Sequence, residues 1–154
     1  MIIQSIALSP KKGTRKTVVE EARLRAGHGL EGDAHAGDWH RQVSFLSAES
    51  IEEARDRGLD VTFGDFAENI ATRGLDWRGV PVGTRLRLGR DALVAISQIG
   101  KKCHNRCAIY HMAGDCIMPR EGVFARVLQG GVVRVGDPVR IEENGADPAP
   151  TPET

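Results

Sequence analysis

Residues 84–99 read TRLRLGRDALVAISQI, and this stretch decides the fold class. Charged and apolar side chains alternate over Arg85–Leu88, which gives a strand one wet and one dry face. Leu88–Ala92 contains Gly-Arg-Asp and is typical of a hairpin turn. An apolar run over Ala92–Ile99 follows it. The stretch therefore predicts two antiparallel strands joined by a tight turn.

Short runs of β-branched residues recur on both sides of this hairpin. We expect further strands over five of them: Ile2–Leu8, Thr17–Leu24, Gln42–Leu46, Val132–Arg134 and Pro138–Glu142. The chain has 18 glycines, and many of them lie between these runs. Closely spaced turn signals between short strands are typical of a β-barrel or a β-sandwich. The pattern predicts a mainly β protein.

Two helices are expected beside the strands. Ser47 can cap a helix that runs to Arg57 and ends at Gly58, because serine oxygens accept bonds from first-turn amides and glycine readily adopts the left-handed conformation. A second helix is expected from Pro119 to the glycines at 130–131. Its apolar residues recur at helical spacing: Val123, Phe124, Val127 and Leu128. A shorter helical turn is expected over residues 65–70.

Length and composition restrict the function classes. The 154 residues fit one domain, which we expect over residues 1–142, followed by a proline-rich, disordered tail over 143–154. The 21 basic and 21 acidic side chains balance, which argues against a general nucleic-acid binder. No apolar run approaches the roughly 20 residues of a membrane span, and the N-terminus does not resemble a signal peptide. We therefore expect a cytoplasmic protein with no nucleic-acid or membrane partner.

The densest chemistry lies between Gly100 and Gly122. Residues 100–107 read GKKCHNRC, so Cys103 and Cys107 have four basic neighbours: Lys101, Lys102, His104 and Arg106. Cationic neighbours favour the thiolate, which is the nucleophilic and metal-binding form of cysteine. The same cations can hold a phosphate. The alternative is that both cysteines only fill core space.

Cys116 precedes Pro119 and is expected near a helix N-terminus, a position that stabilises a thiolate or a phosphate. A packed core thiol is the alternative. Together the three cysteines have the spacing C-x3-C-x8-C. Structural zinc sites usually have two ligand pairs, and only Cys103 and Cys107 form such a pair. Zinc bound by the three cysteines and a histidine such as His104 stays an open alternative, and the odd cysteine count favours a reducing compartment.

A second polar constellation lies in the glycine-interrupted loop over residues 29–42. It contains Asp33, His35, His40 and Arg41, and loops on a rigid scaffold often carry binding residues. The histidines can act as ligands or proton carriers. Alternatively, they cap strands while Asp33 only holds a turn. Farther along, Asn69 can hydrogen-bond a heterocycle or close a helix.

At these residues the chain resembles the MOSC domain, the module found at the C-terminus of molybdenum cofactor sulfurases, in mitochondrial amidoxime-reducing components and as stand-alone bacterial proteins. The resemblance covers roughly residues 1–142 and rests on five motifs in order: 31–35, 40–44, 64–70, 100–104 and 131–139. It implies a β-barrel with a few peripheral helices.

The resemblance also implies a molybdopterin-type cofactor, or sulfur handled on its way to the metal. Cys107 lies in a segment similar to the one whose cysteine ligates molybdenum in the amidoxime-reducing members, whereas Cys103 lies where stand-alone bacterial members place theirs. The candidates to hold the pterin and its phosphate are Arg120 and the polar residues named above: Asp33, His35, His40, Arg41, Asn69, Lys101, Lys102, His104 and Arg106. We expect no pyridoxal phosphate on this chain.

The leading hypothesis is a cofactor-binding or sulfur-carrier domain that uses Cys107 or Cys103 and works with a sulfur donor or a molybdoenzyme. One alternative is a zinc-stabilised interaction module in which Cys103, Cys107 and Cys116 bind the metal. Another is a small, partner-dependent reductase of N-hydroxylated compounds. The sequence leaves the oligomeric state and the physiological substrate open.

Overall fold

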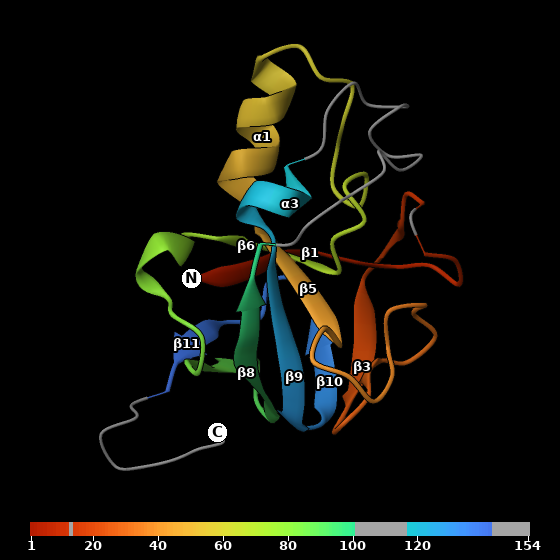
Figure 1. Cartoon of the computed structure of the whole chain (residues 1–154), viewed down its shortest axis with the longest axis vertical. Helices are drawn as coiled ribbons and strands as arrows, with labels where there is room; N and C mark the ends of the chain where they lie inside the picture. The colour runs from red at the N-terminus through yellow and green to blue at the C-terminus, as the bar shows by residue number, and fades with distance from the viewer. Residues whose placement is uncertain (13, 101–116, 143–154) are drawn as a thin grey trace.

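The computed structural model describes residues 1–12, 14–100 and 117–142 (Figure 1). The strands in these ranges are β1 (Ile2–Leu8), β2 (Thr17–Val19), β3 (Glu21–Arg25), β4 (Gly29–Leu30), β5 (Val43–Ser47), β6 (Ile70–Arg73), β7 (Arg85–Leu88), β8 (Ala92–Ile99), β9 (Val123–Gln129), β10 (Gly131–Arg134) and β11 (Val139–Ile141). The helices are α1 (Ala48–Asp56), the short α3 (Met118–Glu121) and the 3-10 turn η1 (Trp77–Gly79). The prediction of a mainly β protein is confirmed.

The strands form two sheets. The larger has the order β11-β7-β8-β9-β5-β6-β1-β2, and the smaller has the order β10-β3-β4. The predicted hairpin is β7–β8, which pairs antiparallel with Leu88 opposite Ala92. Leu86 and Leu88 are fully buried, whereas Arg85 and Arg87 are partly exposed. The alternation in the sequence thus predicted the faces of this strand correctly.

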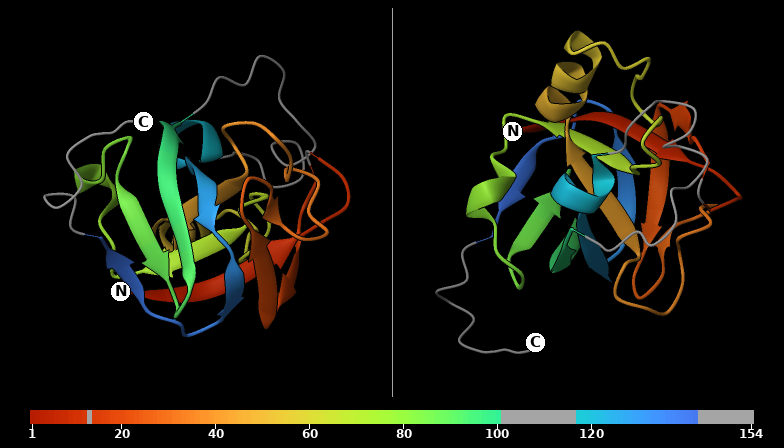
Figure 2. Two further views of the ribbon diagram at one scale, coloured as in Figure 1. Left: turned by 90° about the horizontal axis from the view of Figure 1, so that it is seen from below. Right: turned by 45° about the horizontal axis from the view of Figure 1, so that its top comes forward.

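The predicted barrel is not confirmed. In the described residues the larger sheet has two edge strands, β11 and β2, which do not pair with each other, so the sheet is not closed. Backbone hydrogen bonds nevertheless join β1 to the turn before β11. The Ile3 amide donates to the Asp137 carbonyl (2.8 Å), the Gly136 amide donates to the Ile3 carbonyl (2.8 Å), and Val139 donates to Met1 (2.9 Å). We call these contacts the terminal seam (Figure 2). It joins the start of the chain to the turn between β10 and β11.

Two apolar clusters stabilise the fold. The larger lies between the sheets and contains Phe45, Ile70 and Val127. The smaller lies beneath α1, where Ile51 and Ala54 pack with Phe66 and Phe124. Burying such side chains contributes roughly 1.5–3 kcal/mol each. The two clusters fix the sheet that supports the polar loops described below.

Helix α1 begins and ends as expected. The Ser50 amide donates to the Ser47 side chain (3.3 Å), so Ser47 is the N-cap. Gly58 has a φ of +104°, a conformation that favours glycine, immediately after the C-cap residue Arg57. The helix prediction over this segment is confirmed.

The helix predicted from Pro119 to residues 130–131 is wrong. Only Met118–Glu121 is helical, and β9 follows. Val123, Ala125 and Val127 face the larger cluster, whereas Phe124 faces the smaller one. That is the two-residue period of a strand, with one face buried throughout and the other buried only at Phe124, since Arg126 is exposed. Leu128, predicted to be part of an apolar helical stripe, is 44% exposed.

Two smaller expectations also differ from the structure. The strand predicted over Thr17–Leu24 is interrupted at Glu20, because β2 pairs with β1 whereas β3 pairs with β10. The helical turn predicted over residues 65–70 is wrong. Ala67 has a φ of +65°, which breaks a right-handed helix, and Ile70 begins β6 instead.

No helix among the described residues is long and apolar enough to cross a membrane.

Candidate functional site

A buried ion pair organises the loop that precedes β5. The side chains of Lys16 and Asp33 are fully buried, and Lys16 Nζ lies 2.7 Å from Asp33 Oδ1. The Ser9 amide donates to the same oxygen (3.0 Å), and the His35 amide donates to Asp33 Oδ2 (3.1 Å). Asp33 therefore does more than hold a local turn, since it connects β1, the start of β2 and the loop.

The charge of Asp33 is stabilised by its partners. Burial by itself would raise the pKa of this carboxyl group, because it penalises the charged form. The hydrogen bond and the positive charge of Lys16, together with the bonds from the His35 and Ser9 amides, outweigh burial and hold the pKa of Asp33 well below its usual range. The site thus contains a carboxylate paired with an ammonium group.

Lys16 also fixes the protonation of His35. Its Nζ lies 3.1 Å from His35 Nδ1. An ammonium group can only donate hydrogen bonds, so Nδ1 accepts and the ring proton lies on Nε2. The side chain of His35 is 20% exposed. His35 therefore has an N–H donor available at Nε2, and Trp39 holds the loop by donating from Nε1 to the His35 carbonyl (2.7 Å).

His40 connects this loop to the end of β8. Its Nε2 lies 2.7 Å from Gln98 Oε1, and Gln98 Nε2 donates to the Gly100 carbonyl (2.7 Å). The Ser97 hydroxyl donates to the His40 carbonyl. Because an amide oxygen can only accept, Nε2 of His40 carries a proton. These bonds hold the loop over residues 33–41 against the end of β8. Residues 101–116, which contain the three cysteines and which we call the cysteine segment, follow this strand in the sequence.

Arg41 is stacked between aromatic rings. Its guanidinium carbon lies 4.5 Å from the ring centre of Trp39 and 5.5 Å from that of Phe124. Lys12 Nζ lies 5.2 Å from the same tryptophan ring. Arg41 Nε is buried and has no hydrogen-bond partner among the described residues. A buried donor of this kind is costly unless an acceptor satisfies it, so the position suits an anionic ligand.

Gly100, the last described residue after β8, lies against the turn that joins α3 to β9. The Gly100 amide donates to the Gly122 carbonyl (2.6 Å). Gly100 has a φ of +70°, and a Cβ there would lie 2.9 Å from the Pro119 carbonyl oxygen. The glycine is therefore required by both conformation and space. Gly100 also accepts the hydrogen bond from Gln98 Nε2, so this turn adjoins the Gln98–His40 contact.

Several predicted site residues lie outside the described residues: Lys101, Lys102, Cys103, His104, Arg106, Cys107 and Cys116. Their roles stay predictions. The predicted C-terminal tail over 143–154 lies outside them as well. Arg120 is described, and it is exposed on α3, where it lines a pocket away from the Arg41 stack.

Asn69 lies at a junction of strands. Its Oδ1 accepts from the Ser44 amide (3.0 Å) and hydroxyl (3.2 Å), and its Nδ2 donates to the Ala7 carbonyl (3.1 Å). The side chain is 1% exposed. It positions β5 against β1 and β6, and its predicted contact with a pterin stays a prediction.

No group of three or more His, Cys, Asp or Glu side chains that could hold a metal occurs within the described ranges. The cysteines proposed as zinc or molybdenum ligands fall outside those ranges.

Sequence reasoning missed Lys16, Gln98 and Trp39 as members of this site. Lys16 belongs to a run of basic residues that looks like an ordinary solvated turn. Gln98 lies within an apolar strand, where nothing indicates a contact to a residue 58 positions earlier. Only the pairing of distant strands brings these side chains to the loop.

The MOSC domain model matches residues 32–140 of the chain. Among solved structures, YiiM from Geobacillus stearothermophilus is 27% identical, with a TM-score of 0.71, over 94% of this chain and 76% of that chain. YiiM from Escherichia coli is 22% identical (TM-score 0.66; 93% and 70% covered). YuaD from Bacillus subtilis is 17% identical (TM-score 0.73; 90% and 93% covered). A comparison with curated protein sequences finds no match.

Proposed function

The chain belongs to the MOSC domain family, and from this premise we propose that it binds a molybdopterin-type cofactor or carries sulfur destined for one. Cys107 or Cys103 would be the reactive thiol. The observation that supports this most strongly is the hydrogen-bonded link from His40 through Gln98 to Gly100. It joins the polar loop to Gly100, the last described residue before the predicted cysteines in the sequence.

The described residues fit an anionic cofactor. The buried Arg41 Nε lacks a partner among them, and a phosphate oxygen would satisfy it. Lys12 lies over the same tryptophan ring as Arg41, so two cations gather there. Arginine binds phosphate well because its planar donors match the phosphate oxygens. Lys101, Lys102 and Arg106 would add further positive charge.

The histidines would position the cofactor. With its proton on Nε2, His35 can donate to a carbonyl or phosphate oxygen, and Lys16 keeps that orientation. His40 is held by Gln98 and would keep the loop closed against β8. When bound, a molybdopterin-type cofactor supplies a redox-active, sulfur-ligated metal. The chain would supply binding, orientation and a thiolate, a ligand type that suits such metals.

In the sulfur-carrier role the cysteine would accept sulfur from a donor persulfide. The thiolate attacks the terminal sulfur, a new S–S bond forms, the donor S–S bond breaks, and the donor thiolate leaves. No external oxidant is needed. The donor or recipient would be a partner protein, either a sulfur donor or a molybdoenzyme, in the reducing environment of the cytoplasm where thiols persist.

The first experiment is to purify the chain from cells that make molybdenum cofactor and to measure bound molybdenum, pterin and zinc. We expect molybdenum or pterin in the wild type and its loss in Cys107→Ala or Cys103→Ala. Intact mass before and after incubation with a persulfide donor reports the gain of one sulfur atom. Zinc alone, with chelator-induced unfolding, would instead favour the zinc-stabilised module.

Arg41→Met tests the anion site without touching a thiol. We expect the pterin content to fall severalfold, while persulfide loading of the cysteine persists. Arg126→Met is the matched control, because Arg126 is an exposed arginine on β9, the strand that carries Phe124. Equal pterin content in the two variants would contradict the proposed role of Arg41. Full cofactor binding and sulfur loading in a Cys103→Ala/Cys107→Ala double variant would refute the whole proposal.

A further inference from the structure

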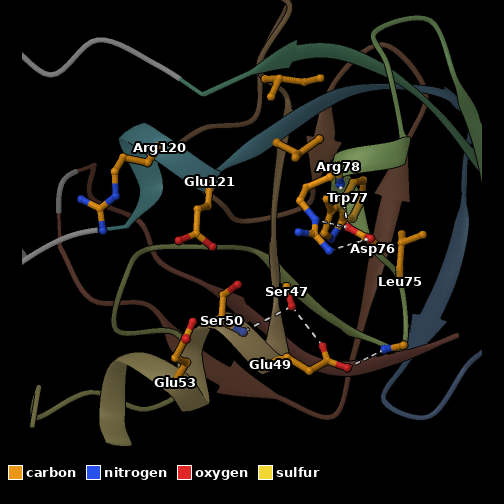
Figure 3. A pocket seen from close by; sticks show the side chains of 13 residues that line it. Ser47, Glu49, Ser50, Glu53, Leu75, Asp76, Trp77, Arg78, Arg120 and Glu121 are labelled. Carbon is orange, nitrogen blue, oxygen red and sulfur yellow. Dashed lines mark hydrogen bonds and ion pairs between the residues drawn. The ribbon is translucent and has the colours of Figure 1, made fainter. Parts of the chain in front are cut away.

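A pocket of about 650 Å³ lies between α1, α3 and the end of β8 (Figure 3). Its walls are α1 from Ser47 to Glu53, the turn over residues 74–78, and α3 with the start of β9. Ile99 also lines it. Successive residues of a strand point to opposite faces, so the Ile99 pocket and the Gln98–His40 contact lie on opposite faces of β8. The volume falls within the roughly 300–1,000 Å³ of small-molecule sites.

The lining carries an excess of negative charge. Arg78 binds Asp76 through two hydrogen bonds (2.9 and 3.0 Å), so these two charges neutralise each other. Burial by itself would raise the pKa of Glu49, but the hydrogen bonds that it accepts, among them those from the Gly74 amide and the Ser47 hydroxyl, together outweigh burial and lower this pKa, so Glu49 remains ionised. The remaining lining charges are those of Glu53, Glu121 and Arg120.

Glu53 and Glu121 are the free carboxylates of the pocket, because neither makes an ion pair or a side-chain hydrogen bond within the described part of the chain. In Figure 3, Glu121 extends from α3 toward Ser50 and Glu53 of α1, whereas Arg120 points away from them. Two unneutralised carboxylates thus face the same space from two different elements. An anion would be repelled there, although the N-terminus of α1 is close.

The opposite wall is apolar and rigid. Trp77 donates from Nε1 to the Thr72 hydroxyl (3.0 Å), and its ring centre lies 5.4 Å from that of Phe45. Leu75 and Val123 line the pocket from buried positions, and the Ile99 side chain is 51% exposed. The half-exposed isoleucine and the fixed indole line the same pocket and provide apolar surface for a ligand.

We propose that this pocket binds a small organic ammonium ion with an apolar body. The ammonium group would lie between Glu53 and Glu121, where opposite charge favours it. The body would pack on Trp77 and Ile99, since aromatic faces attract both apolar groups and cations. Binding requires neither the cofactor nor a cysteine. The proposal therefore stands apart from the function proposed above.

The test is a titration of the isotopically labelled wild-type chain with benzylamine, followed by the two indole N–H resonances in NMR spectra. The chain has two tryptophans. Trp39 does not line the pocket and its ring lies against Arg41, so it is an internal control. We expect the Trp77 resonance to shift and the Trp39 resonance to stay. The shift should weaken with added salt. Benzyl alcohol, which has the same body without the charge, should bind at least severalfold more weakly.

Glu53→Gln/Glu121→Gln should raise the dissociation constant of benzylamine roughly five- to thirtyfold, as expected for two exposed carboxylates. Glu20→Gln, an exposed acid remote from the pocket, should leave it unchanged. Urea midpoints check that both variants fold. Equal binding of benzyl alcohol, an unchanged constant in the double variant, or no Trp77 shift at millimolar benzylamine would each overturn the proposal. Benzylamine should also bind to the Cys103→Ala/Cys107→Ala variant, because the pocket needs no thiol. A failure of the proposed cysteine function would then leave the pocket proposal standing.

Discussion

Lys16 and Asp33 show how one buried pair can hold a functional loop. Both side chains are fully buried, and Asp33 also accepts from two backbone amides. Buried pairs are often no more stabilising than apolar residues of the same size, but removing one partner leaves an uncompensated charge. Here the pair also orients His35, so its loss would affect both stability and the site.

We predict that Asp33→Asn lowers the free energy of unfolding at pH 7 by about 3–5 kcal/mol, because Lys16 keeps a buried charge without its partner. Urea denaturation measures this. Asp38→Asn, an exposed change in the same loop, should cost less than about 0.5 kcal/mol. Similar losses in the two variants would contradict the assigned role of Asp33.

The same pair makes stability depend on acid pH. The pKa of Asp33 is lower in the folded chain than in the unfolded chain. Its contribution is therefore complete above pH about 4 and is lost as the pH falls through the folded value. The unfolding free energy of Asp33→Asn should therefore fall less than that of the wild type as the pH is lowered from 5 to 2. Urea midpoints of the two proteins over this pH range measure the difference.

Glu68 is a buried acid whose pKa shifts in the other direction. It is 1% exposed, its Oε2 accepts from the Gly64 amide (2.6 Å), and its Oε1 has no partner among the described residues. Burial raises the pKa of Glu68 to about 7, against the opposing effect of its backbone hydrogen bonds. In the folded chain the neutral form is thus the stable one at mildly acid pH.

We predict that stability falls as the pH rises from about 4.5 to 7, because the folded chain then binds a proton that the unfolded chain has released. Glu68→Gln keeps a neutral side chain and an acceptor for Gly64. Its unfolding free energy should vary less over this range and should exceed that of the wild type at pH 8. A wild-type profile that is flat or rises between pH 4.5 and 7, other acids being equal, would contradict the raised pKa.

At the level of elements, β9 is the central strand that joins both apolar clusters. It pairs with β5 on one side and β8 on the other, so its backbone groups are satisfied by neighbouring strands. Val127 is 2% exposed and Leu128 is 44% exposed. A helix over the same residues would bury both side chains together, whereas a strand separates them.

We predict that Val127→Ala lowers the unfolding free energy by about 1–3 kcal/mol, since it removes buried methyl groups from a packed core. Leu128→Ala should cost less than about 0.5 kcal/mol because its side chain is half exposed. Thermal or urea unfolding of the two variants measures the difference. Equal losses would indicate that the faces of β9 are assigned wrongly.

For the whole molecule, the terminal seam joins the two ends of the described fold. Residues 1–3 and 136–139 are far apart in sequence, and three backbone hydrogen bonds connect them, two of which form the Ile2–Pro138 bridge. Long-range contacts of this kind form only when the whole sheet is assembled. The terminal seam should therefore open only when the whole domain unfolds.

We predict that the amides of Ile3, Gly136 and Val139 exchange hydrogen with a free energy close to that of global unfolding. The amide of Gly32, exposed in the polar loop, should exchange within the dead time. Native-state hydrogen exchange by NMR measures both. Rapid exchange at Ile3 and Val139 would show that the seam frays independently of the sheet.

The sequence by itself determined the local elements and the family. Alternating Arg85–Leu88, the following turn and the Ser47 cap predicted β7, β8 and α1, because period, turn chemistry and capping depend on neighbours in the chain. The five motifs indicated the MOSC family, which the family model confirms over residues 32–140. The apolar run that begins at Val123 did not reveal which kind of element it forms. A short apolar run fits a buried strand and a helix equally well, so β9 was mistaken for a helix.

Only the tertiary structure decided which side chains meet. Lys16 reaches Asp33, His40 reaches Gln98, and Glu121 faces Glu53 because sheet pairing brings distant segments together. Neither the protonation of His35 nor the raised pKa of Glu68 can be read from the residues alone, since both follow from burial and partners. The physical reason is that burial and charge pairing are properties of three-dimensional neighbourhoods, whereas composition and periodicity record only neighbours along the chain.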